Sequence, residues 1–429
     1  MSLYDKASLI MTPSGVKSAK IYSKKPFNAN GDFTFDRSTV ATRVNKDGLI
    51  ETVAIDIPRL NYPLIDGVAQ DCPSLLLEPA RTNFGKYSEQ ISSWTQSKLT
   101  TSDNQTISPD ASQNASKTTV TAATGSHPVY VSHINVVTSG ANYVMSIFVK
   151  KSTTNYIRFS EGYSNYNLIF NFDTEEISTS GNSTIDDLIV EKHLNDWYRL
   201  SVKFVADSSL DVQPAIYVRN NSNADVYTGV DEAVFIWGLQ IESGSYPTSY
   251  IPNLATGSTT RAAETATGAG TSADFNDSEG VLYAECSLVD DLTTRVITIN
   301  DSSNQLAERV QIYALGSSIY ARVVDGGATQ GQVIGTPTLI NSNKIAFKYK
   351  TNDFALWING FKVDTSNSGT TASGLNKMMF DAGTGGSPFY GNTKEVAYFK
   401  EALTDTELES LTSWDSFSDM ATGQLYSIK

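Results

Sequence analysis

The alternation of apolar and polar residues with period two constrains the fold of this 429-residue chain more than any other sequence feature. Successive side chains of a β-strand point to opposite faces of a sheet, so the alternation predicts half-buried strands. We expect the odd-numbered residues of 143–149 to share a buried face, and the even-numbered residues of 198–204 to do the same. The odd-numbered residues of 233–241 are expected to form a third apolar face. Turns of Ser, Asn and Gly separate these segments, which is typical of an antiparallel β-sandwich.

The same pattern returns after residue 273 and predicts a second sandwich. Asn359-Gly360 lies between two alternating runs and predicts a two-residue hairpin, because both residues tolerate the positive φ of a type I′ turn. One helix is predicted near the end of the chain. Thr404 as its N-cap, with Glu407 three residues later, forms a capping box.

Two segments lack a continuous hydrophobic pattern. Residues 1–73 are short apolar pieces broken by turn residues, so we expect an extended arm that is ordered by a neighbouring subunit or another protein. Residues 254–272 consist almost wholly of Ala, Gly, Thr and Ser, so we expect a flexible linker and some relative domain motion. The predicted fold class is all-β. Its predicted parts are a docking region at 1–73, a sandwich at 74–253, the linker at 254–272, a second sandwich at 273–420 and a tail at 421–429.

Composition excludes several classes of protein. The net charge is −14, and residues 1–80 hold 9 basic and 9 acidic residues, so the whole excess lies beyond them. A surface of that sign repels phosphate backbones, and we expect no nucleic-acid partner. No run of 18 apolar residues and no secretory signal are apparent, so we expect no membrane insertion. The two cysteines, Cys72 and Cys286, predict neither a disulfide framework nor a zinc site.

Three long motifs carry a resemblance to a known family. The sequences are FTFDRSTVATRVNKDGLIE at 33–51, SLLLEPARTN at 74–83 and WGLQIESGSYPTSYIP at 237–252. They resemble tailed-bacteriophage virion proteins, in which the last two motifs flank a carbohydrate-binding-module-like β-sandwich. EVAYFKEALTDTELESLT at 395–412 resembles the closing strand and helix of concanavalin-A-like (laminin-G-like) domains. The resemblance implies two jelly-roll, lectin-like sandwiches.

The resemblance also implies a function. We expect a non-enzymatic virion structural protein, a tail or head appendage or decoration, that is made in the host cytoplasm and displayed on the virion surface. Its expected partners are other virion proteins, bound through residues 1–73, and further copies of itself, with a trimer favoured. Its sandwiches would contact host-surface or mucus polysaccharide, or pack as a decoration shell. The alternatives are a tail-associated glycan depolymerase and a secreted adhesin encoded by a prophage.

The sequence offers little for catalysis, and we expect no catalytic residues. The Glu-x-Asp-x-x-Glu strand pattern of concanavalin-like glycanases is missing. Asp186-Asp187 and Asp290-Asp291 are adjacent pairs whose side chains would face opposite ways in a strand. The three histidines, at positions 127, 133 and 193, are too few for most relay or metal sites.

Sugar recognition requires aromatic faces for stacking and a few planar polar groups. In the first sandwich, Arg158, Tyr163 and Tyr166 lie around a turn rich in Gly, Ser and Asn. In the second sandwich, strand alternation places Trp357 on the opposite face from its apolar neighbours. The same aromatic residues could equally fill subunit interfaces or the core. The candidate glycan-binding residues are Arg158, Tyr163, Tyr166, Tyr313, Tyr320, Arg322 and Trp357.

Calcium is the one cofactor that the sequence leaves open. Oxygen-rich turns supply the hard ligands that calcium prefers, although their spacing matches no EF-hand. Ordinary turn chemistry explains the same residues. The candidate ligands are Asp274, Asn276, Asp277 and Glu279.

Overall fold

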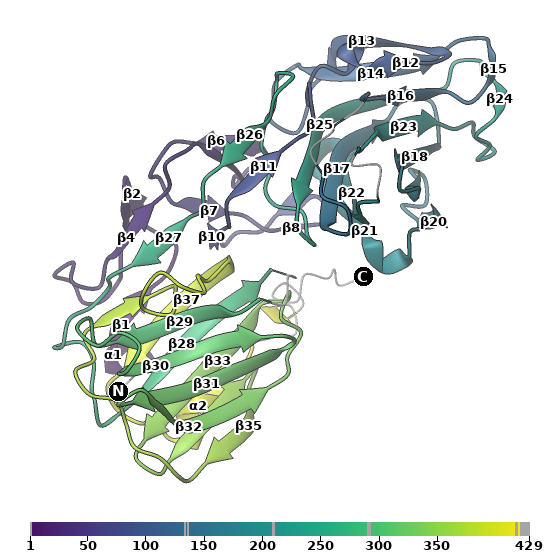
Figure 1. The fold of residues 1–429 in the computed structure, drawn as a ribbon. Helices are drawn as coiled ribbons and strands as arrows, with labels where there is room; N and C mark the ends of the chain where they lie inside the picture. Colours follow the sequence, from purple (N-terminus) through teal and green to yellow (C-terminus); the bar gives the residue numbers. More distant parts are fainter. Residues whose placement is uncertain are drawn as a thin grey trace.

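The computed structural model describes residues 2–132, 134, 137–207, 211–289, 293–416 and 419–420. The regular secondary structure is almost entirely antiparallel β-strand, as the alternation predicts. Two β lobes lie at either end of the molecule, and strands of the N-terminal region lie between them (Figure 1). His133, Asp290, Asp291 and the expected tail at 421–429 lie outside the described residues. Among the residues described, no helix has the length and apolar character that a membrane span requires.

The first sandwich consists of two six-stranded sheets. The β25 sheet has the strand order β13-β14-β25-β17-β22-β21, and the β18 sheet has the order β12-β16-β23-β18-β19-β20. The two faces predicted at 143–149 and 198–204 both point into the core between the sheets, which confirms that part of the strand pattern. The strands are β12 (Thr95–Gln96), β13 (Leu99–Thr106), β14 (Ala115–Val120), β16 (Pro128–Tyr130), β17 (Asn142–Lys151), β18 (Tyr156–Glu161), β19 (Tyr166–Asn171), β20 (Ile177–Gly181), β21 (Leu188–His193), β22 (Trp197–Val205), β23 (Pro214–Val218) and β25 (Ala233–Ser243).

The third predicted face, on β25, is wrong because a bulge divides the strand. Gly238 has φ +69, and the pairing of β25 with β17 shifts register at this point. A bulge adds one residue and reverses the facing of the residues after it, so Leu239 points into the core, whereas Trp237 packs on the outer side of the sheet. A Cβ on Gly238 would lie 2.8 Å from the Phe148 ring. Trp237 and Gly238, which begin the motif at 237–252, therefore form the bulge at which the strand reverses its buried face.

The second sandwich pairs a large sheet with a five-stranded one. The β28 sheet has the order β35-β34-β33-β28-β37-β10-β7, with β1 also on β37, and the β30 sheet has the order β32-β31-β30-β29-β36. The strands are β1 (Ala7–Met11), β7 (Arg59–Asn61), β10 (Ser74–Leu77), β28 (Glu279–Leu288), β29 (Arg295–Asn300), β30 (Arg309–Leu315), β31 (Ser318–Asp325), β32 (Ala328–Gly335), β33 (Asn343–Lys350), β34 (Phe354–Ile358), β35 (Phe361–Ser366), β36 (Lys377–Met379) and β37 (Gly391–Phe399).

The structure confirms both local predictions for this domain, the hairpin at Asn359-Gly360 and the helix that begins after Thr404. Asn359 and Gly360 have φ of 50° and 87°, as a type I′ turn requires, and they join β34 to β35. Helix α2 (Asp405–Thr412) has Thr404 as its N-cap and a complete capping box with Glu407.

The N-terminal region is ordered by its own chain, which corrects the expectation that a neighbouring molecule orders it. β1 pairs with β37, and β7 and β10 extend the same sheet. Leu9 and Met11 are fully buried in the core of the second sandwich. The hairpin of β5 (Ala41–Val44) and β6 (Ile50–Val53) places Ile50 against the outer side of the β25 sheet. Each short apolar piece finds a partner far away in sequence, which local composition could not reveal.

The expected linker also contains two strands. β26 (Thr259–Arg261) pairs with β11 (Arg81–Asn83), and β27 (Thr265–Thr267) pairs with β4 (Phe33–Asp36). Arg261 and Glu264 are each 1 % exposed. The apolar content of this segment is low, as the sequence indicates, but two buried charged residues fix it in place.

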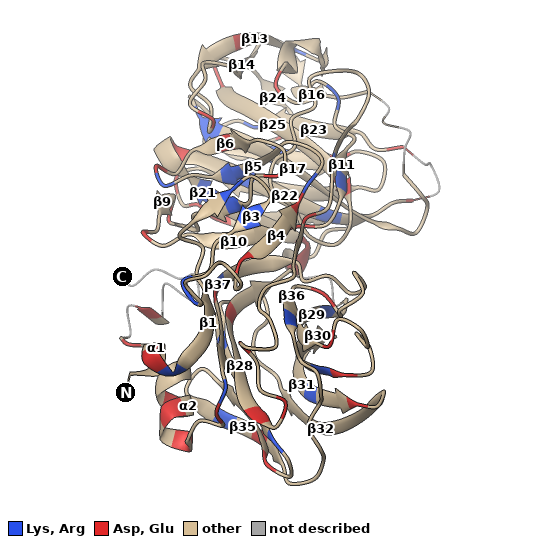
Figure 2. Cartoon of the chain, turned by 90° about the vertical axis from the view of Figure 1, so that its left-hand side faces the viewer, with Lys and Arg blue, Asp and Glu red and all other residues tan. Residues whose placement is uncertain are grey.

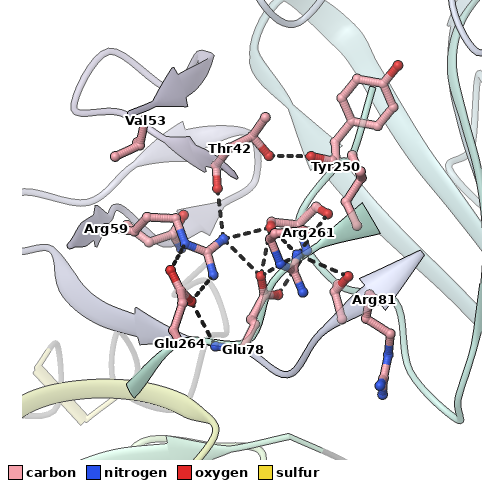
Figure 3. Close-up of polar contacts among 12 residues, drawn as sticks. Thr42, Val53, Arg59, Glu78, Arg81, Tyr250, Arg261 and Glu264 are labelled. Atoms are coloured by element: carbon pink, nitrogen blue, oxygen red, sulfur yellow. Dashed lines mark hydrogen bonds and ion pairs between the residues drawn. The ribbon is translucent and has the colours of Figure 1, made fainter. Parts of the chain in front are cut away.

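A buried ion network joins the N-terminal strands, the segment at 254–272 and the first sandwich (Figure 3). The Glu264 carboxylate receives hydrogen bonds from Arg37 Nη1 at 2.6 Å and Arg59 Nε at 2.8 Å. The Glu78 carboxylate lies 2.8 Å from both Arg59 Nη1 and Arg261 Nη1. These five side chains are at most 7 % exposed. Figure 2 shows Lys and Arg positions close together along the backbone around β5 and β21.

Hydrogen bonds from the third long motif, at 237–252, complete the network. The Ser249 amide and hydroxyl both donate to the Glu78 carboxylate, at 2.9 and 2.7 Å. Asn83 Nδ2 donates to the Leu239 and Ile251 carbonyls, which ties this motif directly to the one at 74–83. Burial by itself would raise the pKa of Glu78, but the charges of Arg261 and Arg59 and the Ser249 hydrogen bonds lower it to about 2.

We predict that the backbone amides of β1 exchange slowly in the isolated protein. The strand is paired along its length with β37, and its side chains are buried on both faces. Hydrogen exchange followed by mass spectrometry on a monomer measures this. Rapid exchange throughout residues 7–11 would show that another molecule orders the strand.

We predict that Glu264→Gln lowers the free energy of unfolding by about 3 to 5 kcal/mol, because it leaves buried guanidinium groups without their counter-charge. The control is Glu51→Gln. The Glu51 carboxylate is 38 % exposed and pairs with Arg43, so its loss should cost less than about 1 kcal/mol. Urea denaturation measures the free energy of unfolding of both variants. Equal losses in the two variants would contradict a stabilising role for the buried network.

Glu78→Gln should make stability less dependent on pH in the acid range. The folded pKa of Glu78 is about 2, against an ordinary value of 4.5. Its contribution is therefore complete above pH 4.5 and is lost as the pH falls toward 2, a total of about 3 kcal/mol. Denaturation at about pH 7, 4 and 3 should show the difference between wild type and variant closing. If the difference in unfolding free energy between wild type and Glu78→Gln stayed the same at all three pH values, the lowered pKa of Glu78 would be contradicted.

Candidate functional site

The outward face of the β18 sheet brings together a guanidinium, an aromatic ring and an amide. The centre of the Arg158 guanidinium lies 3.7 Å from the centroid of the Tyr217 ring. Arg158 Nη1 donates to Asn167 Oδ1 at 2.9 Å, and its Nε lies 3.4 Å from the Asp225 carboxylate. Arg219 also pairs with Asp225, at 2.6 Å. The Arg158 guanidinium and the Asn167 amide are thus held beside the Tyr217 ring, and the Asp225 carboxylate offsets part of the positive charge.

Strand register explains this cluster. Arg158 of β18 pairs with Tyr217 of β23 on one side and with Ile169 of β19 on the other. Cross-strand neighbours on one face of a sheet are in contact distance. The alternating neighbours Ile157 and Phe159 are fully buried in the core, which leaves Arg158 on the outer face.

A groove of about 520 Å³ lies along the same sheet. It combines an aromatic ring, aliphatic surface, amides and carboxylates, a mixture suited to a ligand with many hydroxyl groups. The lining residues are Tyr156, Ile169, Asn171, Glu175, Glu176, Ile177, Ser178 and Asn223.

The two other aromatic candidates of this sandwich lie elsewhere. Tyr166 belongs to the core side of β19, and its ring centroid lies 6.3 Å from that of Phe204. Tyr163 lies in the turn after β18, where burial and then the charge of Asp211 raise the pKa of its hydroxyl. The structure therefore does not gather Arg158, Tyr163 and Tyr166 into one cluster, because the strand alternation separates Tyr166 from Arg158.

The second sandwich does gather three of its candidates. The rings of Tyr313 and Tyr320 are stacked, with centroids 5.1 Å apart and an interplanar angle of 17°. The Arg322 guanidinium lies 4.8 Å from the Tyr313 centroid. All three side chains lie on the outward face of the β30 sheet, because Ile312, Ile319 and Ala321 occupy the core face.

Trp357 is not available for stacking on a ligand, which corrects its assignment as a glycan-binding residue. It does lie on the opposite strand face from Phe354, Leu356 and Ile358, as the alternation predicts. That face is covered, however, and Trp357 is 5 % exposed in a cluster with Leu408 of helix α2. The sequence predicts the helix but not its position over β34.

The four candidate calcium ligands are held by protein donors. The Asp274 carboxylate accepts from the Thr271 amide and hydroxyl, and the Asp277 carboxylate accepts from the Gly374 and Leu375 amides. Asn276 Nδ2 donates to the Lys400 carbonyl, and Glu279 pairs with Lys350. Within the described ranges no three His, Cys, Asp or Glu side chains are placed to hold one metal ion. The four residues therefore do not converge on a common point.

The two histidines that the structure describes, His127 and His193, are both buried. His127 is fully buried, and its ring nitrogens lie 2.9 Å from the Lys98 carbonyl and 3.3 Å from the Tyr227 carbonyl. His193 is 6 % exposed beside Phe148, and burial together with the charge of Arg199 lowers its pKa to about 3. Cys72 is exposed and Cys286 is buried, and neither forms a disulfide.

Comparisons with known proteins find low similarity to several solved structures. No protein-family model and no curated protein matches the chain. Among solved structures, the CBM40 of the Ruminococcus gnavus IT-sialidase matches 32 % of this chain and 84 % of its own, at 16 % identity and a TM-score of 0.28. Domain 4 of AbnA, an arabinanase from Geobacillus stearothermophilus in complex with arabinotriose, matches 35 % and 73 %, at 12 % identity and a TM-score of 0.28. Mouse laminin α1 LG4-5 matches 79 % and 93 %, at 10 % identity and a TM-score of 0.23.

Sequence reasoning finds Arg158 but misses its partner Tyr217. The signal is present in residues 214–218, where Ile216 and Val218 are apolar and Tyr217 alternates with them. Asn167 and Asp225 have no comparable signal, because their roles depend on the pairing of β18 with β19 and on the loop after β23.

Proposed function

We propose that this chain is a non-enzymatic structural protein of a bacteriophage virion that binds glycans through the outward face of the β18 sheet. The observation that carries the binding role is the Arg158 guanidinium stacked on the Tyr217 ring beside the 520 Å³ groove. The Tyr156 ring that lines the groove supplies a stacking surface for the C–H face of a sugar, while Asn171 and Asn223 supply hydrogen-bonding groups for its hydroxyls. The virion role is supported by the motifs at 33–51, 74–83 and 237–252.

The N-terminal region supplies the proposed surface for other virion proteins. Three aromatic side chains are exposed there: Phe27 at 86 %, Tyr4 at 48 % and Tyr22 at 38 %. Exposed aromatic residues are enriched at protein interfaces. We place the protein on the virion surface as a homo-oligomer, with a trimer favoured, and we assign it no cofactor.

Tyr217→Ala should weaken glycan binding about tenfold, because it removes the ring on which the Arg158 guanidinium is held beside the groove. The matched control is Tyr22→Ala, which removes a ring of the same kind from the N-terminal region. A glycan array of host-surface and mucus polysaccharides identifies the ligand, and titration calorimetry then measures both variants.

Two outcomes would contradict this proposal. One is a folded wild-type protein that binds no glycan on the array. The other is release of oligosaccharide that stops when Glu176 of the groove is changed to Gln, which would indicate a depolymerase.

A further inference from the structure

The outward face of the β30 sheet carries two neighbouring arginines without a carboxylate partner. Arg309 and Arg322 are diagonal neighbours, because Gln311 pairs with Arg322 and Arg309 pairs with Val324. Arg309 Nη1 donates a long hydrogen bond of 3.5 Å to the Ala382 carbonyl, and Arg322 Nη1 donates one of 3.4 Å to Thr329 Oγ1. Within the part of the chain that the structure describes, neither forms an ion pair. Acidic residues outnumber basic ones by 46 to 32, so carboxylates are not scarce.

The nearby carboxylates are turned toward other donors. Glu308 accepts from the Gly326 and Ser373 amides, Asp325 accepts from the Thr370 hydroxyl, and Asp381 accepts from the Gly383 amide. Burial, and then the charge of Arg322, lowers the pKa of Arg309. The fold therefore keeps two positive charges close together and leaves them uncompensated.

Buried polar atoms on the same face also lack partners. Gln311 is 2 % exposed and Thr298 is fully buried, and they pair in register with each other and with Arg322 in one row across the sheet. Within the described residues, Gln311 Oε1, Thr298 Oγ1 and the Nε atoms of both arginines have no hydrogen-bond partner. A buried polar group without a partner is costly, and a ligand hydroxyl can donate to Gln311 Oε1 while a carboxylate oxygen can accept from the arginine N–H groups.

We propose that this face binds a carboxylate-bearing polysaccharide. The planar guanidinium groups of Arg309 and Arg322 receive the sugar carboxylate, since a guanidinium and a carboxylate can form two parallel hydrogen bonds. The Tyr320 ring, which is stacked on the buried Tyr313 ring, lies beside Arg322 on this face and gives the sugar ring a surface on which to lie. The site is separate from the outward face of the first sandwich, where Arg158 and Arg219 both pair with the Asp225 carboxylate.

The test is titration of the full chain with oligogalacturonate, with dextran oligosaccharide as the neutral probe and sodium sulfate as the small anion. Wild type should bind oligogalacturonate, and the double variant Arg309→Gln, Arg322→Gln should bind it at least about tenfold more weakly. The matched control is Lys348→Gln with Lys350→Gln. It makes the same change in net charge on β33 of the opposite sheet, where both lysines are paired with carboxylates, and it should change affinity by less than about twofold.

A second variant separates binding from folding. Gln311→Leu removes a buried amide oxygen that has no hydrogen-bond partner among the described residues, so the melting temperature should be unchanged or higher, while the affinity for oligogalacturonate falls. The proposal is overturned if wild type does not bind oligogalacturonate, if both double variants weaken binding equally, or if sulfate or dextran binds as well as oligogalacturonate. Failure of glycan binding at the β18 sheet would leave this result standing, because the two faces belong to different sandwiches.

Discussion

The buried pairing of Arg37, Arg59 and Arg261 with Glu78 and Glu264 is the interaction on which the arrangement of this chain depends. Charges without solvent are costly unless each is paired and hydrogen-bonded. The five residues come from four separate stretches of sequence, so the network forms only when the N-terminal strands, the segment at 254–272 and the end of the first sandwich are all in place. It supplies specificity of arrangement, whereas the apolar cores of the sandwiches supply most of the burial.

This network also explains what the recognisable motifs do. Arg37, Glu78 and Ser249 each lie within one of the three long motifs, and all three contribute to the network. The groups proposed to bind ligands, Arg158 with Tyr217 and Arg309 with Arg322, lie outside these motifs. The motifs therefore inform us about architecture, and the ligand must be inferred from the two outward sheet faces.

Local patterns predict the elements well and their assembly poorly. The hairpin at Asn359-Gly360 and the cap at Thr404 depend on a few adjacent residues, and both predictions are confirmed. The bulge at Gly238 and the burial of Trp357 depend on neighbours more than 40 residues away, and the sequence pattern misses both. The same reason applies to the segment at 254–272. Its composition is that of a flexible linker, but Arg261 and Glu264 find partners that lie far away in the sequence.

The central claim is that the segment at 254–272 is a fixed part of the fold and not a flexible linker. Limited trypsin digestion of the native protein tests it most directly, because Arg261 is a trypsin site in the middle of this segment. Its side chain is 1 % exposed and donates to the Pro79 carbonyl, so we predict that the bond after Arg261 survives while exposed lysines are cut. Rapid cleavage after Arg261 in the otherwise folded protein would contradict the account.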